Sequence, residues 1–214
     1  NSIVGHSLGG YYCAYIIPIQ TSFSAFFIND ASIWYNSGDA LTHIKQNLPK
    51  GYNTNVYITS GLKFDGPDVM VRNHLNKIDS LNVLLQTYPN INLGSKSYPN
   101  EHHLSMYLYS VMDGLTYIFE DCEYGYISLE DDITLQSYRA HYKKTSERLG
   151  FEFAAPLNGI LYVGYANHNQ KKWQNAIDAF EACYSKVEND IYVNKALAEC
   201  YKNLGDKKKS KHYN

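Results

Sequence analysis

The chain has 214 residues, of which 44% are apolar and 19% charged, and its formal net charge is −2. This balance excludes a disordered tail, and it gives no electrostatic basis for binding nucleic acid or an acidic membrane surface. The length allows one domain, or one domain with a smaller second unit. No segment is long and apolar enough to span a membrane. Because the chain starts inside a motif, the sequence indicates neither a cytoplasmic nor a periplasmic localisation.

The first chemical signal is the motif GHSLGG, which surrounds Ser7. An apolar strand ends at Ile3-Val4 before the motif, and a mostly apolar helix follows it and ends near Pro18. Gly5 and Gly9 flank the serine, where a sharp strand-to-helix turn needs small residues. This order predicts the nucleophile elbow of an α/β-hydrolase, the turn that exposes the catalytic serine. A glycine-rich turn with an idle serine is the other interpretation.

A serine nucleophile needs a base, and the base needs an acid that orients it. In α/β-hydrolases these residues follow in the chain order Ser, Asp or Glu, His. One donor of the oxyanion hole is the backbone N–H of the residue after the nucleophile, which is Leu8 here. The acid and the base are therefore expected downstream of Ser7.

The base is expected where a strand from Ile91 to Ser97 passes, through a turn at Pro99-Asn100, into a helix. The helix is predicted from apolar residues at helical spacing, namely Leu104, Tyr107, Val111, Met112, Leu115 and Phe119. His102 and His103 lie at the junction and are the two candidates. The other six histidines are expected to be structural or solvated: His6, His43, His74, His141, His168 and His212.

The acid is expected after the preceding strand, at Val56–Thr59, where a loop leads to a helix opened by Pro67. Asp65 lies in that loop and is the favoured candidate. Asp68 would fall in the first helical turn, where the helix dipole already explains an acidic residue. Asp30, which follows a strand at 23–28, is the third candidate. The helix is expected to face inward through Val71, Leu75, Ile78, Leu81 and Leu85.

Three separated segments, GHSLGG, FFINDASIWYN and YPNEHHLSMYLYSVMDGLTYIF, resemble an esterase family of α/β-hydrolases. This family includes enterochelin-esterase-like and esterase-D-like enzymes, and the resemblance covers residues 1 to about 120. Its Glu-x-His-x-Ser segment matches EHHLS at 101–105 and implies that His103 is the base. Its SPSxWW-like segment reads DASIWY here, so that Asp30 and Ala31 replace Ser and Pro. The family glutamate after the glycine matching Gly61 is absent, which leaves Asp65 as a shifted, shorter acid.

The sequence predicts only four strands, whereas an α/β-hydrolase sheet has about eight. We therefore expect the chain to be the C-terminal portion of a larger esterase. The early strands and the second oxyanion donor would lie upstream, so this fragment alone is expected to be a poor esterase. The predicted regions are a partial hydrolase domain at 1–120, a connecting helical segment at 121–157 and a helical region at 158–214.

The C-terminal region has a different pattern from the rest of the chain. A charged helix is predicted from Ile133 to Leu149, and two helical stripes of apolar residues follow it. Gly164 and Ala198 are 34 residues apart, which is the period of the tetratricopeptide repeat. The segment resembles one such repeat and the start of another, and an ordinary helical hairpin is the alternative. We expect it to pack on the hydrolase or on another chain.

These observations predict a serine hydrolase that acts on small-molecule carboxylic esters through Ser7, His103 and Asp65, with Leu8 in the oxyanion hole. The chemistry requires no cofactor and no metal. The four cysteines, Cys13, Cys122, Cys183 and Cys200, form no ligand spacing and are expected to be structural thiols. The alternative is a non-catalytic interaction protein whose helical tail binds a protein partner.

Overall fold

The computed structural model describes residues 1–19, 22–64 and 67–214. The chain divides into two units. The first comprises Asn1–Asp121 with Arg148–Gly150, and the second comprises Cys122–Glu147 with Phe151–Asn214. The division into 1–120, 121–157 and 158–214 stays a prediction.

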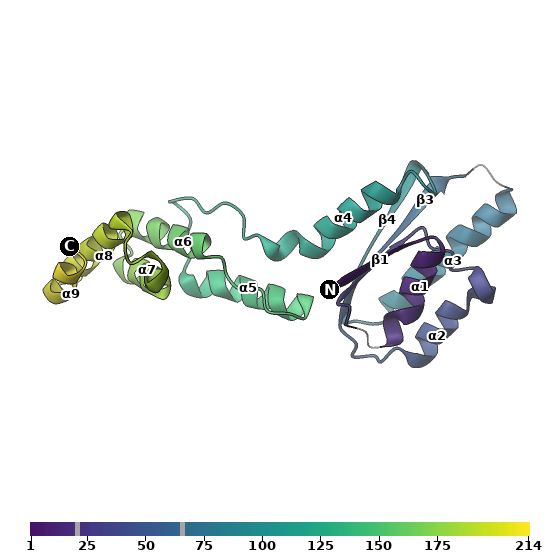
Figure 1. The fold of residues 1–214 in the computed structure, drawn as a ribbon, viewed down its shortest axis with the longest axis horizontal. Helices are drawn as coiled ribbons and strands as arrows, with labels where there is room; N and C mark the ends of the chain where they lie inside the picture. Colours follow the sequence, from purple (N-terminus) through teal and green to yellow (C-terminus); the bar gives the residue numbers. More distant parts are fainter. Residues whose placement is uncertain (20–21, 65–66) are drawn as a thin grey trace. The chain divides into compact units, whose positions relative to one another are not determined.

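The first unit is built on a parallel sheet (Figure 1). The strand order in this sheet is β1-β2-β3-β4. The strands are β1 (Ser2–His6), β2 (Ala25–Asn29), β3 (Thr54–Lys63) and β4 (Ile91–His102). Within the described part of the chain these are the four strands that the sequence predicts. The arrangement is consistent with an α/β-hydrolase-like fold.

Helices cover both faces of this sheet. The helices α1 (Leu8–Ile16), α2 (Asp39–Asn47) and α3 (Asp68–Gln86) share one core with alternate residues of the central strands, including Phe26 and Val56. The opposite face carries Phe27 and Tyr57, against which α4 (Tyr107–Phe119) packs. The central strands β2 and β3 are therefore buried on both faces over most of their length, as expected for a parallel sheet. Short 3₁₀ turns lie at Ile17–Ile19, Tyr35–Gly38 and Glu120–Cys122.

The predicted turn at Pro99-Asn100 is wrong, because β4 continues through both residues to His102. The ladder pairs Tyr98 with Gly61 and, after a register shift, His102 with Lys63. Within the described residues, β3 is the only strand beside β4. The backbone nitrogen of Pro99, which has no hydrogen to donate, can therefore lie on the side of β4 that has no partner strand.

The apolar stripe predicted for α4 is not its buried face. The helix buries Ser110, Gly114 and Ile118, whereas Met112 and Leu115 are exposed. A β-carbon on Gly114 would lie 2.5 Å from the Phe27 ring, so close contact with the sheet requires a residue without a side chain. Small residues at a four-residue spacing therefore decide how this helix packs.

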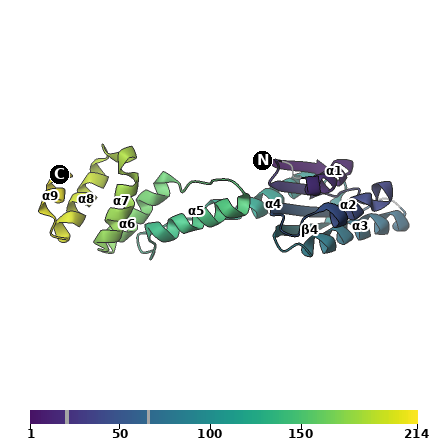
Figure 2. The same cartoon turned by 90° about the horizontal axis from the view of Figure 1, so that it is seen from below.

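The second unit is helical (Figure 2). Its helices are α5 (Leu135–Leu149), whose last two residues belong to the first unit, α6 (Leu157–Asn169), α7 (Trp173–Val187), α8 (Ile191–Asn203) and α9 (Lys207–His212). Each helix from α6 to α8 packs on the next helix along the chain. Asp190 caps α8 by accepting hydrogen bonds from the backbone N–H groups of Tyr192 and Val193. The tetratricopeptide character of this unit stays a prediction.

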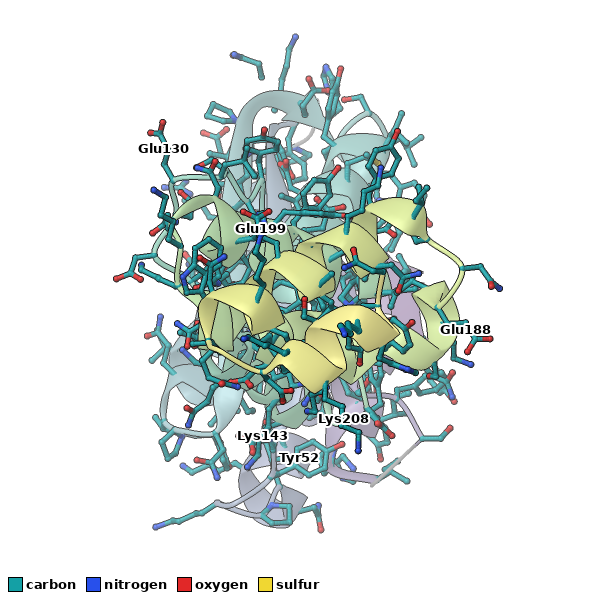
Figure 3. All side chains as sticks on the ribbon, turned by 90° about the vertical axis from the view of Figure 1, so that its left-hand side faces the viewer. Tyr52, Glu130, Lys143, Glu188, Glu199 and Lys208 are labelled. Atoms are coloured by element: carbon teal, nitrogen blue, oxygen red, sulfur yellow. The ribbon has the colours of Figure 1, made fainter. Side chains whose placement is uncertain are left out.

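The surface of the second unit carries charges of both signs. Its exposed charged residues include Glu130, Lys143, Glu188, Glu199 and Lys208 (Figure 3). Over the described ranges, no helix combines the length and the apolar character that crossing a membrane would require.

Candidate active site

The parallel register brings the ends of β1, β2 and β3 to one edge of the sheet. His6 pairs with Asn29, and Asn29 pairs with Thr59. Ser7 and Asp30, the next residues of their strands, therefore lie side by side at the carboxyl edge, where α/β proteins bind ligands. His103 follows the last residue of β4 at the same edge.

Ser7 joins β1 to α1 in a strained conformation. Its backbone angles are φ 57° and ψ −118°, in a region that costs a non-glycine residue about 1–3 kcal/mol. Three backbone hydrogen bonds hold it there: its N–H donates to the carbonyl of Asn29, and its carbonyl accepts from Tyr11 and Ser32. A sharp turn from a strand to a helix at the serine is the geometry that the sequence analysis expects around Ser7.

Leu8 is the first residue of α1. The first N–H groups of an α-helix have no acceptor inside the helix. The Leu8 N–H, adjacent to Ser7, is therefore available to stabilise negative charge on a ligand at this point.

The close approach at the elbow involves Gly5 and Gly10 rather than Gly9. A β-carbon on Gly5 would lie 2.1 Å from the carbonyl oxygen of Gly9, and one on Gly10 would lie 2.7 Å from the β-carbon of Ala31. A β-carbon on Gly9 would meet no atom within 4 Å. The expectation that Gly9 must be small is therefore wrong, since the contact uses only its backbone.

Asp30 and His103 form a short hydrogen bond. Asp30 Oδ2 lies 2.6 Å from His103 Nδ1, and the carboxylate is fully buried while the imidazole is 35% exposed. A hydrogen bond from a ring N–H to a buried carboxylate is charge-assisted and fixes the orientation of the ring. It leaves Nε2 of His103 as the nitrogen that can accept a proton.

The loop that carries His103 is held on two sides. His6 Nε2 lies 2.7 Å from the carbonyl oxygen of His103, and the two rings pack with centroids 4.3 Å apart. Ser105 accepts a hydrogen bond from the backbone N–H of His102 and donates one to Glu101. The residues of the Glu-x-His-x-Ser segment therefore build the turn that positions His103.

The second oxygen of Asp30 also has partners. Oδ1 lies 3.0 Å from His74 Nε2 and accepts a hydrogen bond of 3.2 Å from the backbone N–H of Gly61. On the far side of the His74 ring, the Trp34 indole N–H donates to Nδ1 at 3.1 Å. Asp30 thus contacts two histidines, one on each oxygen.

The other two acid candidates have different environments. Asp65 lies outside the described residues. Asp68 is the first residue of α3 and is exposed, where it complements the helix dipole. Asp30, the third candidate of the sequence analysis, is the one whose carboxylate contacts His103.

Sequence reasoning gave His74 and Trp34 no role at the site. His74, predicted to be structural or solvated, is buried on the inward face of α3 with Ile78, Leu81 and Leu85. Its spacing of four and seven residues from Ile78 and Leu81 was the available signal, because a histidine on a buried helix face needs polar partners.

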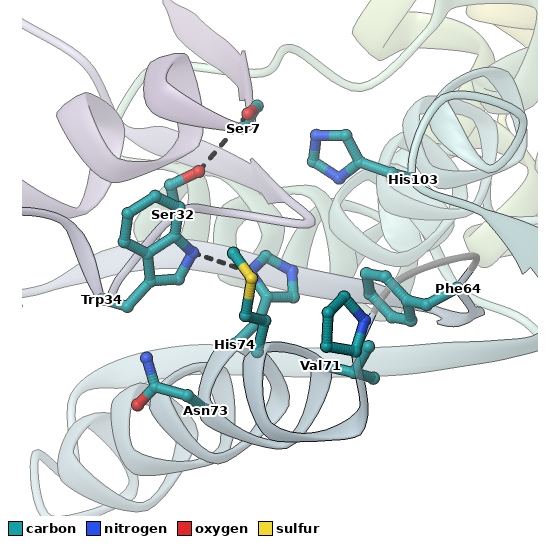
Figure 4. A pocket seen from close by; sticks show the side chains of 10 residues that line it. Ser7, Ser32, Trp34, Phe64, Val71, Asn73, His74 and His103 are labelled. Carbon is teal, nitrogen blue, oxygen red and sulfur yellow. Dashed lines mark hydrogen bonds between the residues drawn. The ribbon is translucent and has the colours of Figure 1, made fainter.

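A cavity of about 440 Å³ opens beside Ser7 and His103 (Figure 4). In it the Ser7 hydroxyl lies 3.3 Å from the hydroxyl of Ser32. The remaining wall is largely apolar and comes mainly from α3 and the residues before it. It is formed by Trp34, Phe64, Pro67, Met70, Val71, Asn73 and His74.

One cluster in the described residues has ligand atoms close enough for a metal ion. It consists of Asp30, His74 and His103, whose ligand atoms all lie within 4.8 Å of one another. Each imidazole nitrogen in this set is already paired with an oxygen of Asp30. A cation would have to replace both hydrogen bonds, so the arrangement fits acid–base chemistry better than metal binding.

Two buried cysteines, Cys13 on α1 of the first unit and Cys200 on α8 of the second unit, have thiols with raised pKa values. Burial raises the pKa of Cys13 to about 11 and that of Cys200 to about 12. A thiol with so high a pKa is protonated and unreactive at neutral pH.

Comparison with solved structures shows similarity to an IroE-like serine hydrolase from Shewanella oneidensis. The TM-score is 0.62 at 22% sequence identity, over 82% of this chain and 56% of that one. An uncharacterised protein from Capnocytophaga ochracea has a TM-score of 0.70 at 14% identity, over 99% of this chain and 61% of that one. The likeness is one of fold.

The chain spans less than two thirds of each of these structures. No family model matches the sequence. No curated protein matches it.

Proposed function

We propose that this chain carries the catalytic centre of a serine hydrolase acting on carboxylic esters. The observation that carries the proposal is the 2.6 Å contact between His103 Nδ1 and the buried Asp30 carboxylate, in a site that shares its cavity with Ser7. A strained serine, an oriented imidazole and a buried acid are the three parts of a Ser-His-Asp triad. The similarity of fold to an IroE-like serine hydrolase supports the proposal.

In this mechanism Ser7 Oγ turns from Ser32 toward Nε2 of His103, which takes its proton as Oγ attacks the ester carbonyl. Asp30 accepts the Nδ1–H of His103 and stabilises the imidazolium. The N–H of Leu8 donates to the oxyanion. The tetrahedral intermediate expels the alcohol, to which His103 returns the proton, and leaves an acyl group on Ser7. Water, deprotonated by His103, then attacks the acyl-enzyme and releases the acid.

The acid in this proposal is Asp30 rather than Asp65, the residue favoured by loop position. Asp30 lies next to Ser7 in the register of β1 and β2, and its carboxylate already contacts the base. The resemblance is compatible with this choice, because Asp30 replaces a serine of the family pattern and no glutamate follows Gly61.

The cavity indicates the type of ester. Trp34, Phe64, Met70 and Val71 line it, and an ionised group placed among these side chains would lose hydration without finding a countercharge. An uncharged, apolar acyl or alcohol group would instead bury apolar surface there. The proposed substrates are therefore esters with at least one apolar side.

We also propose that α6 to α9 form a tetratricopeptide-like array. A β-carbon on Gly164 of α6 would lie 2.5 Å from the Phe180 ring of α7, so the two helices approach closely at the predicted small position. Ala198, at the equivalent position of α8, is buried, and its carbonyl accepts a hydrogen bond from the Ser210 hydroxyl of α9. Nothing in the described residues indicates a protein partner for this unit.

The proposal is tested by hydrolysis of p-nitrophenyl butyrate. Ser7→Ala should reduce kcat by at least about 10³-fold, because the nucleophile is lost. Ser32→Ala, a matched change at the neighbouring hydroxyl, should keep most of the activity. Equal activity of the wild type and Ser7→Ala would refute the assignment. Absence of hydrolysis together with absence of covalent labelling of Ser7 by a fluorophosphonate would favour the non-catalytic alternative.

A further inference from the structure

Asp30 has more partners than a Ser-His-Asp triad requires. The triad uses Oδ2, which contacts His103, whereas Oδ1 contacts His74 and the backbone N–H of Gly61. Both Asp30 and His74 are buried, with exposed fractions of 0% and 7%. A second buried histidine on the triad acid therefore needs a role of its own.

The Trp34 contact determines which nitrogen of His74 carries a proton. The indole N–H of Trp34 can only donate, and it points at Nδ1 of His74 at 3.1 Å. Nδ1 must therefore accept and carry no proton. A neutral imidazole has one N–H, so the proton is on Nε2, which donates to Asp30 Oδ1 at 3.0 Å. A doubly protonated His74 would place two N–H groups against each other.

The neutral form of His74 matters for the charge on Asp30. A cationic His74 would form an ion pair with the carboxylate and compensate its negative charge. A neutral His74 donates a hydrogen bond to Oδ1 but brings no positive charge, so the carboxylate keeps its full negative charge. That charge is then available to the imidazolium that forms on His103 during attack.

From these contacts we propose, on the basis of the proposed esterase function, that His74 and Trp34 are positioning residues for the triad acid. Trp34 fixes the tautomer of His74, and His74 together with the Gly61 N–H fixes the plane of the carboxylate. Oδ2 is thereby aimed at Nδ1 of His103. The same proton on His74 Nε2 opposes metal binding to the Asp30, His74 and His103 cluster.

The decisive comparison is between two replacements of His74. His74→Leu keeps an apolar body on α3 but removes the donor, and it should lower kcat by about 10- to 100-fold, with KM changed less than about twofold. His74→Gln can present an amide N–H to Asp30 and an amide oxygen to Trp34, and it should restore most of kcat. Asn76→Leu, an exposed change on the same helix, is the matched control and should leave kcat unchanged.

A second readout does not depend on turnover. The short bond between His103 Nδ1 and Asp30 should give a far-downfield proton resonance in the NMR spectrum of the wild type. The resonance should persist in His74→Gln and move or broaden in His74→Leu. It should also move in Trp34→Phe, where His74 loses the donor that fixes its tautomer.

Two results would overturn the inference: His74→Leu with unchanged kcat and an unchanged resonance, or His74→Gln as impaired as His74→Leu. If His74→Leu does not fold, Trp34→Phe decides, and an unchanged resonance in that variant overturns the inference. If the wild type neither hydrolyses esters nor reacts with a fluorophosphonate, the proposed function fails. The NMR comparison would then still decide whether His74 orients Asp30.

Discussion

Asp30 combines three features that distinguish it from an exposed aspartate in a loop. It has a positive φ of 41°, its side chain is fully buried, and its carboxylate accepts hydrogen bonds from two side chains and one backbone N–H. A buried carboxylate is costly unless such donors compensate its desolvation. The backbone strain and the buried charge occur together beside the strained Ser7, which is the pattern expected of a functional site.

Replacing Asp30 tests the identity of the acid. Asp30→Asn keeps the size of the side chain but removes the charge that stabilises the His103 imidazolium, and kcat should fall by roughly 10³- to 10⁴-fold. Asp65→Asn is the matched control and should remain near the wild-type kcat. Both are measured by steady-state hydrolysis of a p-nitrophenyl ester. A larger loss for Asp65→Asn would return the role to the residue favoured by loop position.

At the scale of elements, the turn from β1 to α1 is tightly packed and has no room for side chains at Gly5 and Gly10. Gly10 lies in the first part of α1 and packs against Ala31, the residue after Asp30. The contact sets how closely α1 approaches the segment that carries the acid. The neighbouring Gly9 is exposed and has room for a side chain.

This difference predicts opposite effects for two matched substitutions. Gly10→Ala should lower the free energy of unfolding by about 1–3 kcal/mol, because its new methyl group would overlap Ala31. Gly9→Ala should be neutral or raise it by up to about 1 kcal/mol, because alanine favours a helix over glycine. Urea unfolding followed by circular dichroism measures both. Equal losses would show that the elbow needs small residues at every position.

Local patterns predicted the elements that depend on neighbours in sequence. The strand, the GHSLGG turn and the helix follow one another, so the strand-to-helix turn at Ser7 could be predicted from the sequence. The end of β4 could not, because Pro99 is accommodated only by the edge position of that strand. The buried face of α4 could not be predicted from hydrophobic spacing either. Gly114 is buried because the rings of Phe27 and Tyr57 leave no room for a side chain at this position.

On the scale of the whole molecule, the contacts of the site depend on residues far apart in the chain. Asp30 and His103 are separated by 73 positions, and Asp30 and His74 by 44. The position of Asp65 in the loop after the third predicted strand made it the favoured acid. The register between the parallel strands β1 and β2 instead brings Asp30 beside Ser7. Such tertiary proximity is not encoded in any local pattern, so the sequence lists Asp30 only as a third candidate and cannot show that its carboxylate contacts His103.

The helical unit has a separate basis for its stability. Its two clusters of buried residues share α7, which contributes Cys183 to one and Phe180 to the other. Stacked helices of this kind gain stability from each neighbour they contact. The sequence predicts helical stripes in this unit, whereas its tetratricopeptide character and a partner for it stay predictions.

The measurement that tests the account most directly is the site of covalent labelling by a fluorophosphonate probe. Such probes react with a serine that an adjacent base has activated. Mass spectrometry of the labelled protein should place the adduct on Ser7, and both Ser7→Ala and His103→Ala should abolish it, whereas His102→Ala should not. An adduct on another serine, or equal labelling of wild type and His103→Ala, would contradict the proposed catalytic centre.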